Sequence, residues 1–178
     1  MLSISVAAAI VLAAWFIGGR QGFDQIGSGG VNQELLPKVG EVAPDFTVYD
    51  LNGRPVSLSE FRGQPVWLNF WGSWCAPCRS EMPEIQRAYE QLAPQGLVLL
   101  AISMRESPDE AAAFAARNDV TFTILTDQYE QATGVDYALV NFPTHIFIDR
   151  QGRVHTIVLA EMDAETALDH GRALIAAS

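Results

Sequence analysis

Cys75 and Cys78 are the only thiols in the chain, and Ala76 and Pro77 separate them. At this spacing the two sulfurs can join as a disulfide or separate as a dithiol, which is the chemistry of thiol–disulfide exchange. A purely structural disulfide would close only a very short loop and would stabilise the fold little. A zinc site usually needs four ligands, and haem attachment needs a histidine where this chain has Arg79. The pair therefore predicts a redox site.

A strand pattern precedes the cysteines and a helical pattern follows them. Residues 65–71 are apolar and aromatic, and apolar residues recur at helical spacing over residues 76–93. The first turn of a helix offers unpaired N–H groups and the positive end of the helix dipole, and both favour a thiolate. Because the thiolate is the nucleophile, Cys75 is predicted to attack and Cys78 to be the less exposed, resolving thiol. Pro77 fits the first turn, where its missing N–H has little effect.

The composition argues against one class of partner. The chain has 178 residues, 49% of them hydrophobic, and a formal net charge of −10. Nucleic-acid binding depends on Lys and Arg side chains that neutralise phosphates, so no nucleic-acid partner is expected. The length indicates one domain with an appendage.

The appendage is expected at the N-terminus. Residues 1–19 form an apolar run without a charged side chain, at the lower limit of length for a membrane-spanning helix. A cleaved signal peptide would need a basic start, which is absent, so we favour an anchor or uncleaved signal over residues 1–19. Residues 20–35 are predicted to be a flexible tether, and residues 36–178 to be the domain. Arg20 alone would favour a cytoplasmic domain.

Strand and helix patterns alternate along the domain. Strands are predicted at residues 46–49, 65–71, 96–103, 120–125, 141–149 and 154–159. Helices are predicted at residues 76–93, 107–117, 128–133 and 163–177. A turn signal at residues 50–53 predicts that residues 56–58 pair back as a hairpin. This order predicts an α/β sandwich with a mixed central sheet.

Several segments resemble the TlpA/ResA type of thioredoxin-fold protein, the membrane-anchored thiol–disulfide oxidoreductases grouped with redoxin and AhpC/TSA-like domains. The most specific segment is LNFWGSWCAPCRSEMP at residues 68–83. Weaker matches lie at residues 40–46, 51–63 and 142–144, so the resemblance covers roughly residues 39–159. It implies a thioredoxin-like three-layer sandwich with a mixed central sheet, plus an N-terminal membrane-spanning helix.

The resemblance also implies roles for single residues. Cys75 would attack, Cys78 would resolve, and Pro143 would be a cis-proline that faces the disulfide. A cis bond there would place a backbone edge beside the sulfurs, where a substrate strand can pair. The frame around the site would consist of Trp74, Pro77, Phe142, Pro143 and Thr144.

Glu81 matches an acidic residue that this subgroup carries three positions after the second cysteine, on the same side of the helix as Cys78. It would accept or relay a proton during exchange, or else it is a solvated acid that the helix dipole favours. Asn69 stands where ordinary thioredoxin has a buried aspartate, which gives Glu81 more weight. His145 is expected to be structural or exposed, although its place beside the predicted cis-proline would let its charge tune the thiols.

The resemblance implies an enzyme that exchanges thiols and disulfides with extracytoplasmic proteins, usually by reducing them and often in cytochrome c maturation. The redox centre would be the Cys75–Cys78 disulfide, with no cofactor and no metal. Electrons would come from a membrane donor. The protein would be a monomer held in the cell membrane by a single pass, with its domain on the extracytoplasmic side.

Two other functions stay open at this point. A thiol peroxidase shares the redoxin framework, but it needs a threonine three positions before its cysteine, where this chain has Gly72. A Cu(I) carrier could use the two thiols and His145 as soft and imidazole ligands. The copper-delivery relatives, however, have a Cys-x-x-x-Cys spacing that this chain lacks.

Overall fold

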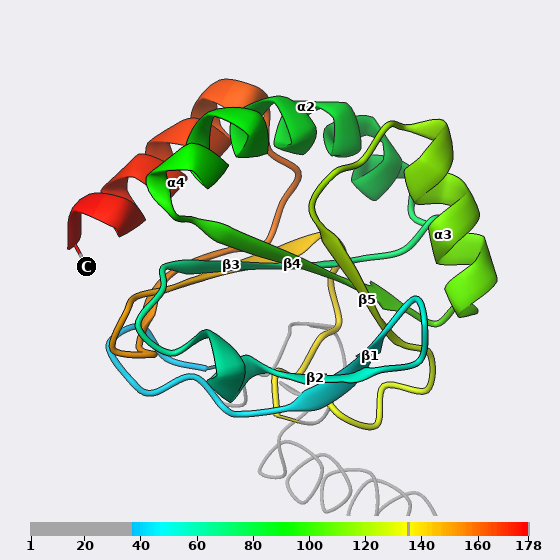
Figure 1. Cartoon of the computed structure of the whole chain (residues 1–178), viewed down its shortest axis with the longest axis horizontal. Helices are drawn as coiled ribbons and strands as arrows, with labels where there is room; N and C mark the ends of the chain where they lie inside the picture. Colours follow the sequence, from blue (N-terminus) through cyan, green and yellow to red (C-terminus); the bar gives the residue numbers. More distant parts are fainter. Residues whose placement is uncertain (1–36, 135, 178) are drawn as a thin grey trace, which may run out of the picture. The chain divides into compact units, whose positions relative to one another are not determined.

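The computed structural model describes residues 37–134 and 136–177. In this part of the chain, seven strands form one sheet in the order β2-β1-β5-β4-β3-β6-β7 (Figure 1). The strands are β1 (Thr47–Asp50), β2 (Pro55–Ser57), β3 (Val66–Trp71), β4 (Val98–Met104), β5 (Thr123–Asp127), β6 (Thr144–Ile148) and β7 (Val154–Val158). The helices are α2 (Ala76–Leu92), α3 (Pro108–Arg117) and α4 (Ala164–Ala177), with short 3-10 turns η2 (Leu58–Phe61) and η3 (Ala93–Gln95).

The centre of the sheet is built from its most apolar strands. Every residue of β3 is buried, and in β4 only the first residue is partly exposed. β4 pairs in parallel with β3 and β5, as expected of strands buried on both faces, whereas β6 is antiparallel to β3. The mixed sheet is therefore confirmed, and so is the edge hairpin, in which Val48 of β1 lies opposite Val56 of β2.

Apolar side chains fill both faces of the sheet. Helices α2, α3 and α4 lie on one face (Figure 1), where Trp67 of β3 belongs to the same buried cluster as Met82 of α2 and Leu174 of α4. Among the described residues, η2 and segments 43–46 and 137–139 cover the other face. Because α2 follows β3 directly and packs against the helix-covered face, its first turn lies at the carboxyl end of β3.

One predicted helix is wrong. Residues 128–133 form turns and bends, and β5 extends to Asp127. The carboxylate of Asp127 accepts the backbone N–H groups of Gln131, Ala132 and Thr133 at 2.8 to 3.1 Å, and the Thr133 hydroxyl at 2.9 Å. An acidic side chain that takes these N–H groups offers the backbone an alternative to helical bonds.

The predicted anchor over residues 1–19 and tether over residues 20–35 lie outside the described residues. Within residues 37–134 and 136–177, no helix has the length and apolar character needed to cross a membrane.

Candidate active site

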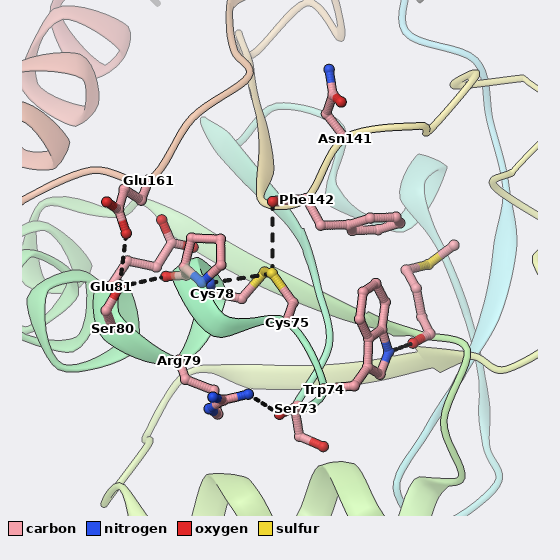
Figure 2. Close-up of a disulfide and its surroundings, with 12 residues drawn as sticks. Ser73, Trp74, Cys75, Cys78, Arg79, Ser80, Glu81, Asn141, Phe142 and Glu161 are labelled. Carbon is pink, nitrogen blue, oxygen red and sulfur yellow. Dashed lines mark hydrogen bonds between the residues drawn. A yellow bond between two sulfur atoms is a disulfide. The ribbon is translucent and has the colours of Figure 1, made fainter. Parts of the chain in front are cut away.

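The two cysteines form a disulfide at the start of α2, with their Cα atoms 5.3 Å apart (Figure 2). Cys75 is the N-cap residue in extended conformation, and its sulfur accepts the backbone N–H of Cys78 at 3.3 Å. Pro77 lies in the first turn, where it removes no helical bond. Cys75 is 6% exposed and Cys78 is fully buried, so only Cys75 can meet a substrate first.

The loop before β6 faces the disulfide. The Phe142–Pro143 peptide bond is cis, as predicted. The carbonyl oxygen of Phe142 points at Cys75 Sγ from 3.6 Å (Figure 2), and it can accept a hydrogen bond from the S–H group of the reduced thiol. The buried hydroxyl of Thr144 donates to the carbonyl of Asn141 at 2.8 Å and closes the turn. The loop thus presents a backbone edge beside the attacking sulfur.

Trp74 forms an exposed aromatic wall beside the site. Its side chain is 45% exposed, and its ring lies edge-on to Phe142 with the centroids 5.3 Å apart. Its Nε1–H donates to the carbonyl of Met104 at 2.8 Å. The indole also covers Gly72, where an added Cβ would lie only 2.3 Å from Nε1. Trp74 is therefore fixed in place while one face stays available to a substrate.

Arg105 is a site residue that the sequence did not indicate. Its guanidinium carbon lies 5.9 Å from the ring centroid of Trp74 and 5.2 Å from that of Phe142, within the range of cation–π attraction. It also forms an ion pair with Glu130. Its φ of 59° belongs to the left-handed region, which favours glycine. Arg105 therefore carries a side chain at a position where the backbone conformation favours a residue without one. No sequence signal marks this position.

Glu81 is buried at 2% exposure, so the alternative of a solvated acid is wrong. Its Oε2 atom lies 3.1 Å from Nε2 of His145 and accepts the backbone N–H of Met162 at 3.2 Å. Its Oε1 atom is buried and has no hydrogen-bond partner among the described residues. The carboxylate is thus partnered on one oxygen only, one helical turn after Cys78.

His145 lies on β6 with no exposed surface, so of the two expected positions, structural or exposed, it takes the structural one. Its Nδ1 accepts the Nε1–H of Trp67 at 3.2 Å, and its Nε2 faces Glu81. Both ring nitrogens are therefore occupied, which leaves none free to bind copper. Asn69, its neighbour in register on β3, is buried without a side-chain partner among the described residues.

Glu106 is a second buried carboxylate that the sequence did not reveal. It is 6% exposed and accepts the backbone N–H of Ser73 at 3.0 and 3.2 Å, the hydroxyl of Ser73 and the hydroxyl of Ser103. These bonds hold the loop that leads into Trp74 and Cys75. In the sequence Glu106 directly precedes the helix cap Ser107, a position that gives no sign of burial.

Candidate metal ligands do not gather elsewhere in this part of the chain. Within residues 37–134 and 136–177, no group of three or more His, Cys, Asp or Glu side chains could hold a metal ion. The chemistry that the described residues bring together is that of the two sulfurs.

The site combines a solvent-reachable sulfur, a buried partner sulfur and a backbone edge that a substrate strand can pair with. This arrangement suits thiol–disulfide exchange, in which one disulfide is attacked and another is formed. With the mixed sheet behind it, the arrangement defines the class of thioredoxin-fold thiol–disulfide oxidoreductases, which act on protein thiols and disulfides through a redox-active disulfide. Within that class, the chain belongs to the AhpC/TSA family, whose sequence profile matches residues 39–157.

Curated relatives agree with this class. The chain is 39% identical over 132 residues to thiol-disulfide oxidoreductase ResA of Geobacillus thermodenitrificans, which covers 74% of this chain and 75% of the relative. It is 36% identical to thioredoxin-like protein YneN of Bacillus subtilis, over 77% of this chain and 84% of the relative.

Solved structures agree as well. A secreted thiol-disulfide isomerase from Corynebacterium glutamicum matches with a TM-score of 0.68 and 34% identity, over 75% of this chain and 85% of the other. A secreted disulfide oxidoreductase of Mycobacterium tuberculosis, homologous to DsbE of E. coli, matches with a TM-score of 0.62 and 27% identity, over 72% and 96% of the two chains.

Proposed function

We propose that the protein reduces disulfides of extracytoplasmic proteins, with Cys75 as the attacking thiol, Cys78 as the resolving thiol and Glu81 as the proton acceptor. The observation that carries this proposal is the unequal burial of the two sulfurs, with a buried carboxylate one turn beyond the inner one. The Cys75 thiolate attacks a substrate disulfide, forms a mixed disulfide and releases one substrate thiolate. Cys78 then loses its proton to Glu81 and attacks Cys75, and the second substrate thiolate leaves. One substrate disulfide becomes two thiols, and the enzyme dithiol becomes a disulfide.

The substrate segment lies in a frame of five residues on either side of the disulfide. It pairs with the backbone edge of the cis-proline loop, where Pro143 and the Phe142 carbonyl stand beside Cys75. The exposed ring of Trp74 supplies an apolar contact. Pro77 shapes the first turn of α2, and Thr144 holds the loop.

The enzyme acts outside the cytoplasm as a monomer, anchored through residues 1–19 and a tether over residues 20–35. The apolar run without charges supports the anchor, and two structural relatives are secreted proteins. A membrane protein supplies the electrons that reduce the disulfide again. The similarity to thiol-disulfide oxidoreductase ResA supports the exchange activity, and a role in cytochrome c maturation follows from the resemblance to the TlpA/ResA type. Membrane fractionation of cells, with protease added from outside, tests the anchor: a domain found in the soluble cytoplasm would contradict it.

The test of the exchange mechanism is insulin reduction by the full chain with two matched variants. Cys75→Ser removes the nucleophile and is expected to abolish turnover. Cys78→Ser leaves the nucleophile but no resolving thiol, and is expected to accumulate a mixed disulfide that mass spectrometry detects. Wild-type rates in both variants would overturn the mechanism.

A further inference from the structure

We propose that His145 is a positioning residue which, together with Trp67, directs the transferred proton to one particular oxygen of Glu81, Oε1. The inference deepens the proposed function and rests on it. The ring nitrogens of His145 bond to Trp67 and Glu81 and not to a sulfur, so His145 acts through Glu81.

The tautomer of His145 follows from the chemistry of its neighbour. The indole Nε1–H of Trp67 can only donate a hydrogen bond, so the ring nitrogen that receives it, Nδ1, carries no proton. A neutral imidazole must then carry its single proton on Nε2. A doubly protonated ring would set two donors against each other at Nδ1, inside a site with no solvent exposure. The pair therefore holds His145 neutral, with Nε2–H aimed at Glu81.

The two oxygens of Glu81 consequently differ. Oε2 receives the Nε2–H of His145 at 3.1 Å and the backbone N–H of Met162 at 3.2 Å. A proton on Oε2 would face two donors and displace one of them. Oε1 is buried and accepts no hydrogen bond among the described residues, so it is the atom with room for a proton.

This difference gives the resolving step a defined direction. In the mixed disulfide, the S–H proton of Cys78 passes to Oε1 of Glu81 while the Cys78 sulfur attacks Cys75 and the substrate thiolate leaves. The carboxylate becomes a carboxylic acid, and no other group changes its protonation. His145 keeps its proton throughout and holds Oε2 in place, so the carboxyl group keeps one orientation.

Three further acidic groups lie around Glu81. Glu84, Glu161 and Asp163 line an open cavity together with Glu81, which gives the proton a way out. The hydrogen bond from Arg87 holds the pKa of Glu84 below its ordinary value, and the N–H of Thr166 does the same for Asp163.

On the side of α4, His170 stacks on Phe147 with the ring centroids 5.2 Å apart. Burial lowers the pKa of His170. Because Phe147 also stacks on Trp67, His170 is the neighbouring histidine to change in a control.

A spectroscopic test reads the tautomer directly. In nitrogen NMR of the full chain in detergent, His145 is expected to show a protonated Nε2 and an unprotonated Nδ1. Trp67→Phe removes the donor to Nδ1, and a second tautomer is expected. A wild-type His145 with its proton on Nδ1 would overturn the inference.

A kinetic test measures how His145 affects the resolving step. The rate at which Cys78 resolves a mixed disulfide is measured against pH, starting from the reduced chain and a small aromatic disulfide. His145→Phe removes the donor to Glu81 and is expected to slow resolution about tenfold at neutral pH and to move its pH profile upward by about one unit. His145→Gln restores an N–H donor to the carboxylate and is expected to restore most of the rate. His170→Gln is expected to match the wild type.

The outcomes separate the two proposals. If Cys78→Ser traps no mixed disulfide, the exchange mechanism itself fails, whatever His145 does. If exchange proceeds and His145→Phe keeps the wild-type pH profile, the mechanism stands and the role of His145 is wrong. If Phe and Gln variants are equally slow, the effect is one of packing, and the role of His145 is again wrong.

Discussion

Two buried carboxylates flank the disulfide, and they are partnered in opposite ways. Glu106 lies behind the loop that enters the site, and donors from Ser73 and Ser103 reach both of its oxygens. Glu81 lies behind Cys78, and both of its donors reach the same oxygen. A carboxylate with both oxygens occupied has no place for an added proton, whereas one with a free buried oxygen does. The number of buried acids near a site thus says less about their function than the distribution of donors over their oxygens.

The largest effect is expected from removing the free oxygen of Glu81. Glu81→Gln keeps the shape and still accepts from His145 and Met162, so the free energy of unfolding should change by about 1 kcal/mol or less. Without a proton acceptor, resolution by Cys78 should slow by about 100-fold. Stopped-flow measurement of the mixed-disulfide intermediate checks the rate. An unchanged rate would remove Glu81 from the mechanism.

Glu106 should show the reverse pattern. Glu106→Ala leaves the donors of part-buried Ser73 and buried Ser103 without their acceptor, so the free energy of unfolding should fall by about 2 kcal/mol. Urea denaturation of the oxidised chain measures this loss. If Glu106→Ala slowed resolution as much as Glu81→Gln does, the proposed division between the two acids would be wrong.

A smaller effect is expected at a single donor to Glu106. Ser103→Ala removes one of the hydroxyls that the carboxylate accepts, which should lower the free energy of unfolding by about 1 kcal/mol. In the Glu106→Ala background the same change should have almost no effect, because the acceptor is already gone. Additive losses in this double-mutant cycle would show that Ser103 and Glu106 are not coupled.

The smallest effect is expected at His170, behind the Glu81 side of the site. Burial holds the pKa of His170 below its ordinary value of 6.5, so the unfolded chain takes up this proton first as the pH falls. The contribution of His170 is therefore complete above pH 6.5 and is lost as the pH falls toward its folded pKa. His170→Gln should flatten the dependence of the melting temperature on pH in this window. An identical dependence in both proteins would count against the shift.

The fold follows from local signals to a large extent. The apolar run that becomes β3, the helical spacing in α2 and the cap at Ser107 each predict their element within a few residues. The segment after Asp127 is the exception, because one side chain takes the N–H groups that a helix would have used. Such competition depends on a single rotamer, which the apolar pattern does not contain.

The site also contains some residues that local signals predict and others that they do not. Cys75, Cys78 and the cis-proline belong to motifs whose residues are adjacent in the sequence. The burial of Glu81 depends on His145 and Met162, which are 64 and 81 positions away along the chain. Spacing on α2 shows only that Glu81 shares a side with Cys78. Partners far away in the sequence therefore determine the burial and hydrogen bonding of Glu81, whereas local spacing shows only on which side of the helix it lies.

The contact between Gly72 and Trp74 has a consequence for the history of the fold. A Cβ at position 72 would lie 2.3 Å from Nε1 of Trp74 and 2.6 Å from its Cε2, closer than real Cβ contacts come. Position 72 is also where a peroxidase would carry its activating threonine. A lineage that moves between disulfide exchange and peroxide reduction on this framework would have to give up the tryptophan before, or together with, gaining the threonine. The two activities are therefore separated by at least two coupled substitutions, with a poorly packed intermediate between them.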